Sequence, residues 1–362
     1  MNQGKIENYF PGGNTAKGFY SFYDYLPYKC QKVYIIKGGP GTGKSTTMKN
    51  IGKKAVNRGY NIEYHWCSSD NDSIDGIVIP DKKTAILDGT APHTVDPKYP
   101  GAVEEIINVG KCWNTQKISR HKNKIIKLNQ KISEKFKQTY RYLSVARIIY
   151  QNWEDYYQKH FNNIIITKTV NNLLGKILPN FNNYTVSGLE RHLFGSAITP
   201  KGLIDFFNEI TKNISKRYIL NGKPEKKKTK IIKKVGQIIL ENGYNVLFLH
   251  CSFNPENIDG IIIRELDTAV INETRPHIID SNKNDEIINL LKGIDASIIS
   301  GYSSAIKNSK KNFNLFLNKA ISRLHRAKIL HDELEEYYIK AMDFEELEKI
   351  QQNLIRNIFS FH

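Results

Sequence analysis

The chain has 362 residues with an ordinary hydrophobic content of 40%, so it is long enough to form two domains with their own cores. No stretch reaches the length of a membrane-spanning helix, and the first residues lack the apolar region of a secretory signal. The four cysteines are widely spaced, which argues against a disulfide scaffold or a zinc site. We therefore expect a cytoplasmic protein. The formal charge of +17 indicates either attraction to nucleic acid or an anionic membrane, or only the lysine-rich composition of an AT-rich coding sequence.

The first strong pattern along the chain is a glycine-rich loop between a predicted strand and a predicted helix. Residues 33–36 form a short apolar run typical of a buried strand, and apolar residues between 48 and 56 recur at helical spacing until Gly59 ends the pattern. The segment between them matches the phosphate-loop pattern G-x-x-x-x-G-K-[ST]. This phosphate loop is Gly38-Gly39-Pro40-Gly41-Thr42-Gly43-Lys44-Ser45-Thr46.

The chemistry of phosphate binding requires these residue types at this spacing. Glycines let the backbone curl so that successive N–H groups point at phosphate oxygens, and the helix N-terminus behind them adds a favourable dipole. Lys44 is placed to reach the β- and γ-phosphates, and the Ser45 hydroxyl is placed to bind Mg²⁺.

Two aspartates after the loop are candidates for metal binding or catalysis. Asp88 ends the apolar run 85–87, as expected for an aspartate that holds Mg²⁺ through water, although an Asp-Gly turn with Gly89 is the structural alternative. Asp70 is either a further catalytic candidate or a cap for the segment that follows. No glutamate directly follows Asp88, which keeps a kinase open as an alternative to a hydrolase.

The chain is a tandem duplication. At a constant offset of 184, about a third of the positions between residues 10 and 96 match without a gap, and the similarity resumes at an offset of 181. The clearest matches are Gly59-Tyr60-Asn61 with Gly243-Tyr244-Asn245, Ile74-Asp75-Gly76-Ile77 with Ile258-Asp259-Gly260-Ile261, Glu105-Ile106-Ile107-Asn108 with Glu286-Ile287-Ile288-Asn289, and Glu154, Tyr156 and Tyr157 with Glu335, Tyr337 and Tyr338.

Each copy predicts an α/β unit with a mainly parallel sheet, a P-loop NTPase-like fold followed by a long helical appendage. We expect domains at 1–160 and 194–362, a connection at 161–193, and helical appendages at about 103–160 and 285–357. Only three or four strands are recognisable in each copy, so the sheet edges stay open and an exchange of strands between the copies is an alternative. An intramolecular pseudo-dimer of the two copies is a further expectation.

The second copy has lost the glycine-rich loop. Residues 222–229, the degenerate loop, read Gly-Lys-Pro-Glu-Lys-Lys-Lys-Thr, so side chains replace bare backbone. Glu225 adds a negative charge where phosphate must lie, which opposes anion binding. Lys228 survives in a run of lysines, where its retention means little. We expect the second copy not to bind nucleotide in the ordinary way.

Comparison of the copies separates candidate functional residues from structural ones. Asp88 and Asp70 are replaced by Asn272 and Asn254 in the copy without the glycines, which supports a functional role for both acids. By the same reasoning Asp75, retained as Asp259, is structural.

His93 lies near the expected phosphate site and is retained as His277, which favours a structural turn over a sensor of the γ-phosphate. Arg264 and Arg275 occur only in the second copy, so either is a candidate arginine finger for the first site if the copies face each other.

The helical appendage of the first copy is strongly basic between residues 111 and 147, with apolar residues at helical intervals on one face. The basic face is a candidate surface for nucleic acid or anionic lipid, and the alternative is a solvated face of a helical hairpin.

The signature Cys67-Ser68-Ser69-Asp70-Asn71-Asp72-Ser73-Ile74-Asp75-Gly76, followed by Asp88-Gly89-Thr90-Ala91-Pro92-His93, resembles that of an uncharacterised family of bacterial tandem P-loop ATPases, over nearly the whole chain. The resemblance implies an ATP-binding protein with no assigned reaction. Members often carry a second glycine-rich loop, from which this sequence departs.

We therefore expect a Mg²⁺-dependent ATPase with one live site in the first copy. Lys44 would hold the phosphates, the backbone of residues 38–43 the triphosphate, and Ser45 and Asp88 the metal. The alternatives are a kinase that phosphorylates a small molecule, with Asp70 as base, and a non-hydrolysing nucleotide switch whose helical arms bind a partner. The choice between ATP and GTP stays open.

Overall fold

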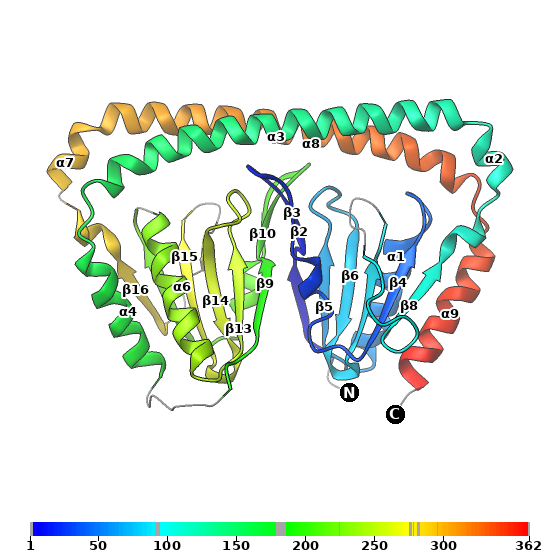
Figure 1. The fold of residues 1–362 in the computed structure, drawn as a ribbon, viewed down its shortest axis with the longest axis horizontal. Helices are drawn as coiled ribbons and strands as arrows, with labels where there is room; N and C mark the ends of the chain where they lie inside the picture. The colour runs from blue at the N-terminus through cyan, green and yellow to red at the C-terminus, as the bar shows by residue number, and fades with distance from the viewer. Residues whose placement is uncertain are drawn as a thin grey trace.

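The structure is a computed structural model that describes residues 3–90, 95–178, 186–223, 225–274, 277, 279–280, 283–294 and 296–360. Two α/β units stand side by side beneath a roof of two long helices (Figure 1). None of the helices in the described ranges is both long and apolar enough to cross a membrane.

The first unit is built on a six-stranded, mostly parallel sheet. The strands follow each other across it in the order β1 (Ile6–Tyr9), β5 (Ile62–Trp66), β6 (Ile74–Ile79), β7 (Thr84–Asp88), β4 (Lys32–Lys37) and β8 (Glu104–Asn108). Only β6 runs antiparallel to its neighbours. Helix α1 (Lys44–Asn57) packs on this sheet through Met48, Ile51 and Ala55, whose spacing of three and four residues places them on one face.

The second unit repeats this arrangement. Its strands follow in the order β9 (Glu190–Phe194), β13 (Val246–His250), β14 (Ile258–Ile263), β15 (Thr268–Glu273), β12 (Lys216–Asn221) and β16 (Asp285–Asn289), and α6 (Glu225–Glu241) takes the place of α1. The expected duplicated α/β fold with mostly parallel sheets is therefore confirmed.

The two units meet around a pseudo-two-fold axis. The N–H of Phe10 donates to the carbonyl of Phe194 at 2.9 Å, and the N–H of Phe194 donates back at 3.0 Å. These residues are 184 apart, so the same position of each copy contacts itself, as at a two-fold interface. Two hairpins rise from this contact to the roof, β2 (Gly12–Thr15) with β3 (Gly18–Ser21) and β10 (Ser196–Thr199) with β11 (Gly202–Asp205) (Figure 1).

The roof consists of α3 (Lys122–Gln158) and α8 (Ser303–Ile339), which run antiparallel across both units (Figure 1). Their buried residues recur at steps of three and four, the spacing of a coiled coil. Leu143 of α3 packs with Leu317 and Leu324 of α8, and the hairpins contribute Ala16 and Ile198 to the same hydrophobic cluster.

The helices that follow the roof cover the opposite copy. Helix α4 (Ile164–Ile177) places Val170 and Leu173 in the core formed by α6 of the second unit, and α9 (Phe344–Ser360) places Leu354 and Ile358 in the core formed by α1 of the first. Each copy therefore completes the hydrophobic core of the other. Short helices join the elements: η1 (Tyr23–Tyr25), η2 (Pro80–Lys82), η3 (Val109–Cys112), α2 (Thr115–Ser119), α5 (Phe207–Thr211), η4 (Arg264–Leu266), η5 (Leu290–Gly293) and α7 (Ala296–Gly301).

Two sequence expectations need correction. Residues 104–108 and 285–289, expected to open the helical appendages, are the edge strands β8 and β16, whose half-exposed, acid-containing sequence hides the strand pattern. The segment 161–193, expected to be only a connection, contains α4 and β9, the equivalents of α9 and β1. Among the described residues each sheet takes its strands from one copy alone, so the copies exchange helices and not strands.

A buried ion pair also ties the copies together. The guanidinium of Arg191 donates to both carboxylate oxygens of Glu63, at 2.9 and 2.7 Å, and the two side chains are only 8% and 12% exposed. Burial alone would raise the pKa of Glu63, but Arg191 and His65 outweigh it and hold that pKa well below its usual range. The pair therefore stays ionised inside the interface.

Removing one member of this pair leaves the other as a buried charge without its partner. Arg191→Ala should therefore lower the free energy of unfolding by about 3 to 5 kcal/mol in urea denaturation. The control is Arg264→Ala at the same interface. Arg264 binds Glu7 but is 48% exposed, so its loss should cost less than about 1 kcal/mol. Equal losses in the two variants would contradict this assignment.

Candidate functional site

The phosphate loop connects β4 to α1 at the carboxyl edge of the first sheet. Gly41 and Gly43 adopt positive φ angles of +66° and +82°, which a side chain would strain. Gly43 is the N-cap of α1, so the loop leads directly into the helix N-terminus and its unpaired N–H groups. The Thr42 hydroxyl donates to the carbonyl of Gly39 at 2.8 Å and closes the loop on itself.

Lys44 lies within this loop and is only 9% exposed. Its ammonium donates to the carbonyls of Gly38 at 3.2 Å and Gly39 at 2.6 Å, and its Nζ is 3.6 Å from a carboxylate oxygen of Asp88. The structure thus brings together two of the residues singled out from the sequence.

Asp88 reaches the loop because β7 pairs in parallel with β4, with Asp88 opposite Ile36 in the register. Both strands therefore end beside the phosphate loop. One Asp88 oxygen accepts the N–H of Thr90 at 2.9 Å, and the Thr90 hydroxyl donates to the carbonyl of Gly38 at 2.8 Å. These bonds fix the carboxylate toward Lys44.

Ser45 is anchored from the other side. Its hydroxyl oxygen accepts the N–H of Ile74, the first residue of β6, at 3.0 Å. The hydroxyl and the Asp88 carboxylate are hard oxygen donors of the kind that Mg²⁺ prefers.

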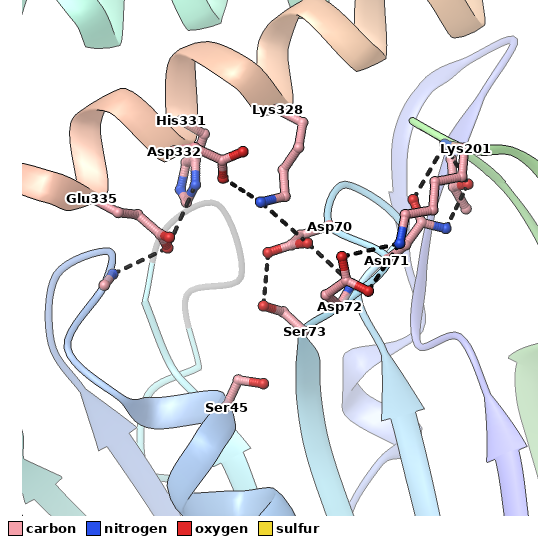
Figure 2. Close-up of polar contacts among 12 residues, drawn as sticks. Ser45, Asp70, Asn71, Asp72, Ser73, Lys201, Lys328, His331, Asp332 and Glu335 are labelled. Atoms are coloured by element: carbon pink, nitrogen blue, oxygen red, sulfur yellow. Dashed lines mark hydrogen bonds and ion pairs between the residues drawn. The ribbon is translucent and has the colours of Figure 1, made fainter.

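Asp70 lies in the turn before β6 and both of its oxygens are engaged. One accepts the Ser73 hydroxyl at 2.7 Å, and the other accepts the N–H of Asp72 at 3.1 Å and lies 3.5 Å from the ammonium of Lys328 (Figure 2). These bonds give Asp70 a turn-forming role, and Lys328 adds a link to α8. Asp75 is buried in β6, whereas His93 lies outside the described residues.

Helix α8 of the second copy covers the phosphate loop of the first, which the sequence interpretation missed. A carboxylate oxygen of Glu335 accepts the N–H of Gly41 at 3.1 Å (Figure 2). A Cβ atom on Gly41 would lie 3.0 Å from that of Glu335, and one on Gly39 would lie 2.8 Å from the ring of Tyr338. The glycines thus also permit close approach of α8. The sequence signal that could have indicated this contact is the match of Glu154 with Glu335 between the copies.

The degenerate loop is contacted by the matching glutamate of α3, one position further along the loop. Glu154 of α3, 1% exposed, accepts the N–H of Lys226 at 3.2 Å. The ammonium of Lys223 stacks over the rings of Tyr150 and Trp153 on α3. Side chains therefore occupy the surface that bare backbone offers in the first copy.

The second copy has also rebuilt the position of Asp88. Its counterpart Asn272 is 1% exposed and donates its amide to Asp259 at 3.0 Å. Lys228 is fully buried and hydrogen-bonds to Thr274. An amide that points into the core offers no charge for a metal. That this copy does not bind nucleotide in the ordinary way stays a prediction.

His277 belongs to a buried polar cluster of the second copy. Its ring nitrogens bind Asp205 at 2.7 Å and Asp259 at 2.8 Å. Burial lowers the pKa of His277, but the two carboxylates outweigh burial and raise it to about 10. The role of His277 is structural, as a buried cation between two acids.

The candidate arginine finger Arg264 is in the wrong place. It follows β14, whose direction is antiparallel to β15, so it lies at the opposite end of the sheet from the phosphate-loop edge. There its guanidinium donates to Glu7 at 2.7 Å and to the Tyr9 hydroxyl at 3.1 Å. Arg275 lies outside the described residues.

Another group above the loop has metal-ligand chemistry. Ligand atoms of His331, Asp332 and Glu335 lie within 4.8 Å of one another on α8. Lys328 already binds Asp332, and Gly41 already binds Glu335, so both carboxylates have partners.

The basic stretch from residue 111 to 147 forms much of α3, and most of its lysines are exposed on the roof.

The His277 cluster predicts a specific pH dependence. A histidine in the unfolded chain has a pKa of about 6.5. The stabilisation of the folded state by protonated His277 should therefore be complete below that pH and should disappear as pH rises toward about 10. The free energy of unfolding of wild type should therefore fall more steeply between pH 7 and 10 than that of His277→Gln, measured by urea denaturation. Parallel pH profiles in the two proteins would show that His277 is not a buried cation.

Comparisons of the chain with protein-family models, with curated proteins and with solved structures found no match. The function must therefore be inferred from the geometry of the site itself.

Proposed function

We propose that the chain binds a nucleoside triphosphate with Mg²⁺ at the phosphate loop of the first copy and hydrolyses it, as an ATPase with one live site. The observation that carries the proposal is the convergence of Lys44 and Asp88 at the ends of two adjacent parallel strands, beside a left-handed glycine turn that opens a helix. A glycine-rich turn that was only structural would not need a buried lysine and a carboxylate at its centre.

The residues divide the work by chemistry. The N–H groups at the start of α1 and in the turn at Gly41 and Gly43 would bind phosphate oxygens, and Lys44 would exchange its loop carbonyls for the β- and γ-phosphates. The donors available to Mg²⁺ are the Ser45 hydroxyl and the Asp88 carboxylate, and these fit a hard cation. Held by these two side chains, Mg²⁺ would supply positive charge that offsets the charge of the phosphates.

The comparison between the copies supports a single site. The second copy keeps a lysine and a threonine at the equivalent places, but its loop carries side chains and its carboxylate is an amide. With side chains in place of bare backbone and without the acid, phosphate and metal would both lose their ligands. The second unit then serves as a scaffold that supplies α8 and α9 to the first.

A nucleotide switch is the second candidate, because α8 lies directly on the loop. Phosphate that binds the N–H of Gly41 must replace the Glu335 carboxylate, so occupancy of the site is linked to the position of a long helical arm. A switch would bind nucleotide and release phosphate very slowly.

A kinase would release ADP only with a small-molecule acceptor, and the engagement of both Asp70 oxygens speaks against Asp70 as its base.

Lys44→Ala should weaken binding of Mg²⁺–ATP or Mg²⁺–GTP at least tenfold, because it removes a charge-assisted contact to phosphate. Calorimetric titration of the full chain measures this, with both nucleotides tested in wild type. Lys228→Ala at the equivalent position of the second copy is the control, and it should leave the affinity within about twofold. Equal losses in both variants, with folding intact, would contradict a single live site.

Asp88→Asn copies the second copy's own replacement and should reduce phosphate release more than tenfold, because the metal loses its carboxylate. Nucleotide binding without Mg²⁺ should change little in this variant. Phosphate release assayed across a Mg²⁺ series checks both points. Unchanged release in Asp88→Asn would exclude this residue as a metal ligand, and absence of release in wild type despite tight binding would favour the switch.

A further inference from the structure

The phosphate loop of the first copy is surrounded by side chains of the second copy. Besides Glu335, helix α8 presents Lys328 and His331 on the face turned toward the first unit (Figure 2). From the other side, the hairpin of the second copy contacts the turn before β6, where Lys201 binds Asp72 and Thr199 accepts the amide of Asn71. The site is therefore assembled from both copies.

Lys328 is held among carboxylates above the loop. Its ammonium binds Asp332 one turn further along α8 and lies 3.5 Å from Asp70 of the first copy. Burial lowers the pKa of Lys328, but the hydrogen bond to Asp332 and the attraction of Asp70 and Glu335 outweigh burial and raise it. The side chain is thus a cation at neutral pH, only 21% exposed and close to three acids.

A short path of contacts connects Lys328 with the proposed metal ligand. Asp70 accepts the hydroxyl of Ser73, and the N–H of the next residue, Ile74, donates to the Ser45 hydroxyl at 3.0 Å. Figure 2 shows Lys328, Asp70, Ser73 and Ser45 one below another beneath α8. Lys328 therefore stands on the side of the site where Ser45 would hold the metal.

Helix α3 over the degenerate loop allows a comparison with α8, because it keeps some of these positions and changes others. At the offset of 181, Lys328 corresponds to Arg147 of α3, and Glu335 corresponds to Glu154. The partners of the lysine are not repeated, because Asp332 is matched by Gln151. The two acids that hold Lys328, Asp332 and Asp70, are thus replaced by the amides Gln151 and Asn254 in the second copy.

We propose that Lys328 binds the terminal phosphate of the nucleotide in trans, from the second copy to the first, and so selects triphosphate over diphosphate. The inference rests on the proposed nucleotide site. On binding, phosphate oxygens replace the Glu335 carboxylate at the N–H of Gly41 and replace Asp70 and Asp332 at the Lys328 ammonium. The acids keep the cation in position until the phosphate arrives.

Affinities for Mg²⁺–ATPγS and Mg²⁺–ADP test this assignment in the full chain. Lys328→Met keeps the aliphatic stem and should weaken ATPγS binding about tenfold while leaving ADP within about twofold. Lys328→Arg should keep the preference for triphosphate, and Arg147→Met, the matched substitution on α3, should change neither affinity. Thermal unfolding of each variant confirms that the fold is intact.

A labelling experiment on the unmodified protein gives a second readout. An adenosine polyphosphate with pyridoxal on its terminal phosphate forms an imine with a nearby lysine amine, with loss of water, and borohydride reduces the imine to a stable amine. Peptide mapping should locate the label on Lys328, and excess ATP should prevent it. Label on Lys44 alone would overturn the proposal.

The two proposals fail in distinguishable ways. If wild type shows no Lys44-dependent binding of either nucleotide, the nucleotide site itself is wrong and this inference falls with it. If binding depends on Lys44 but Lys328→Met lowers both affinities equally, or neither, the nucleotide site stands and Lys328 is only a structural ion-pair residue.

Discussion

The antiparallel packing of α3 against α8 is the contact on which the rest of the structure depends. Because the two helices pair along their length, each one delivers the helix that follows it onto the opposite unit, where α4 and α9 close cores that would otherwise expose apolar side chains. The same pairing places Glu335 on one loop and Glu154 on the other. The surroundings of each loop are therefore a property of the assembled pair and not of either copy.

On this symmetric scaffold the two loops have diverged in chemistry. In the first copy, left-handed glycines expose backbone N–H groups and a buried lysine faces a carboxylate. In the second, the Lys223 side chain stacks on the aromatic rings of α3, and Asn272, the counterpart of Asp88, is bonded into the core through its amide. The shared helices have been kept while packed side chains cover the loop of the second copy, so overall similarity between the copies coexists with different chemistry at the two loops.

The parts of the fold that depend on local pattern could be predicted from the sequence, and the parts that depend on assembly could not. The strand, glycine loop and helix around Lys44 follow from short-range signals, and the position of Asp88 follows from its apolar strand. The edge strand at residues 104–108 was missed because charged and exposed side chains dilute its alternation. In the sequence, Lys328 is one of many lysines on a polar helix. It lies near the phosphate loop because α8 packs across both units as part of the roof, an arrangement that no local sequence pattern encodes.

The exchange of α4 and α9 has a consequence for how such a protein has to be made. A single copy of this unit could bury its apolar arm only on a second molecule, so its site would form at a rate and to an extent set by concentration. Residues 178–189, between α4 and β9, join the two copies covalently and turn that encounter into an intramolecular one with a high effective concentration. Fusion also removes the requirement that both halves be identical, because each half is made only once per molecule. The second unit is then free to specialise as a permanent built-in partner for the first.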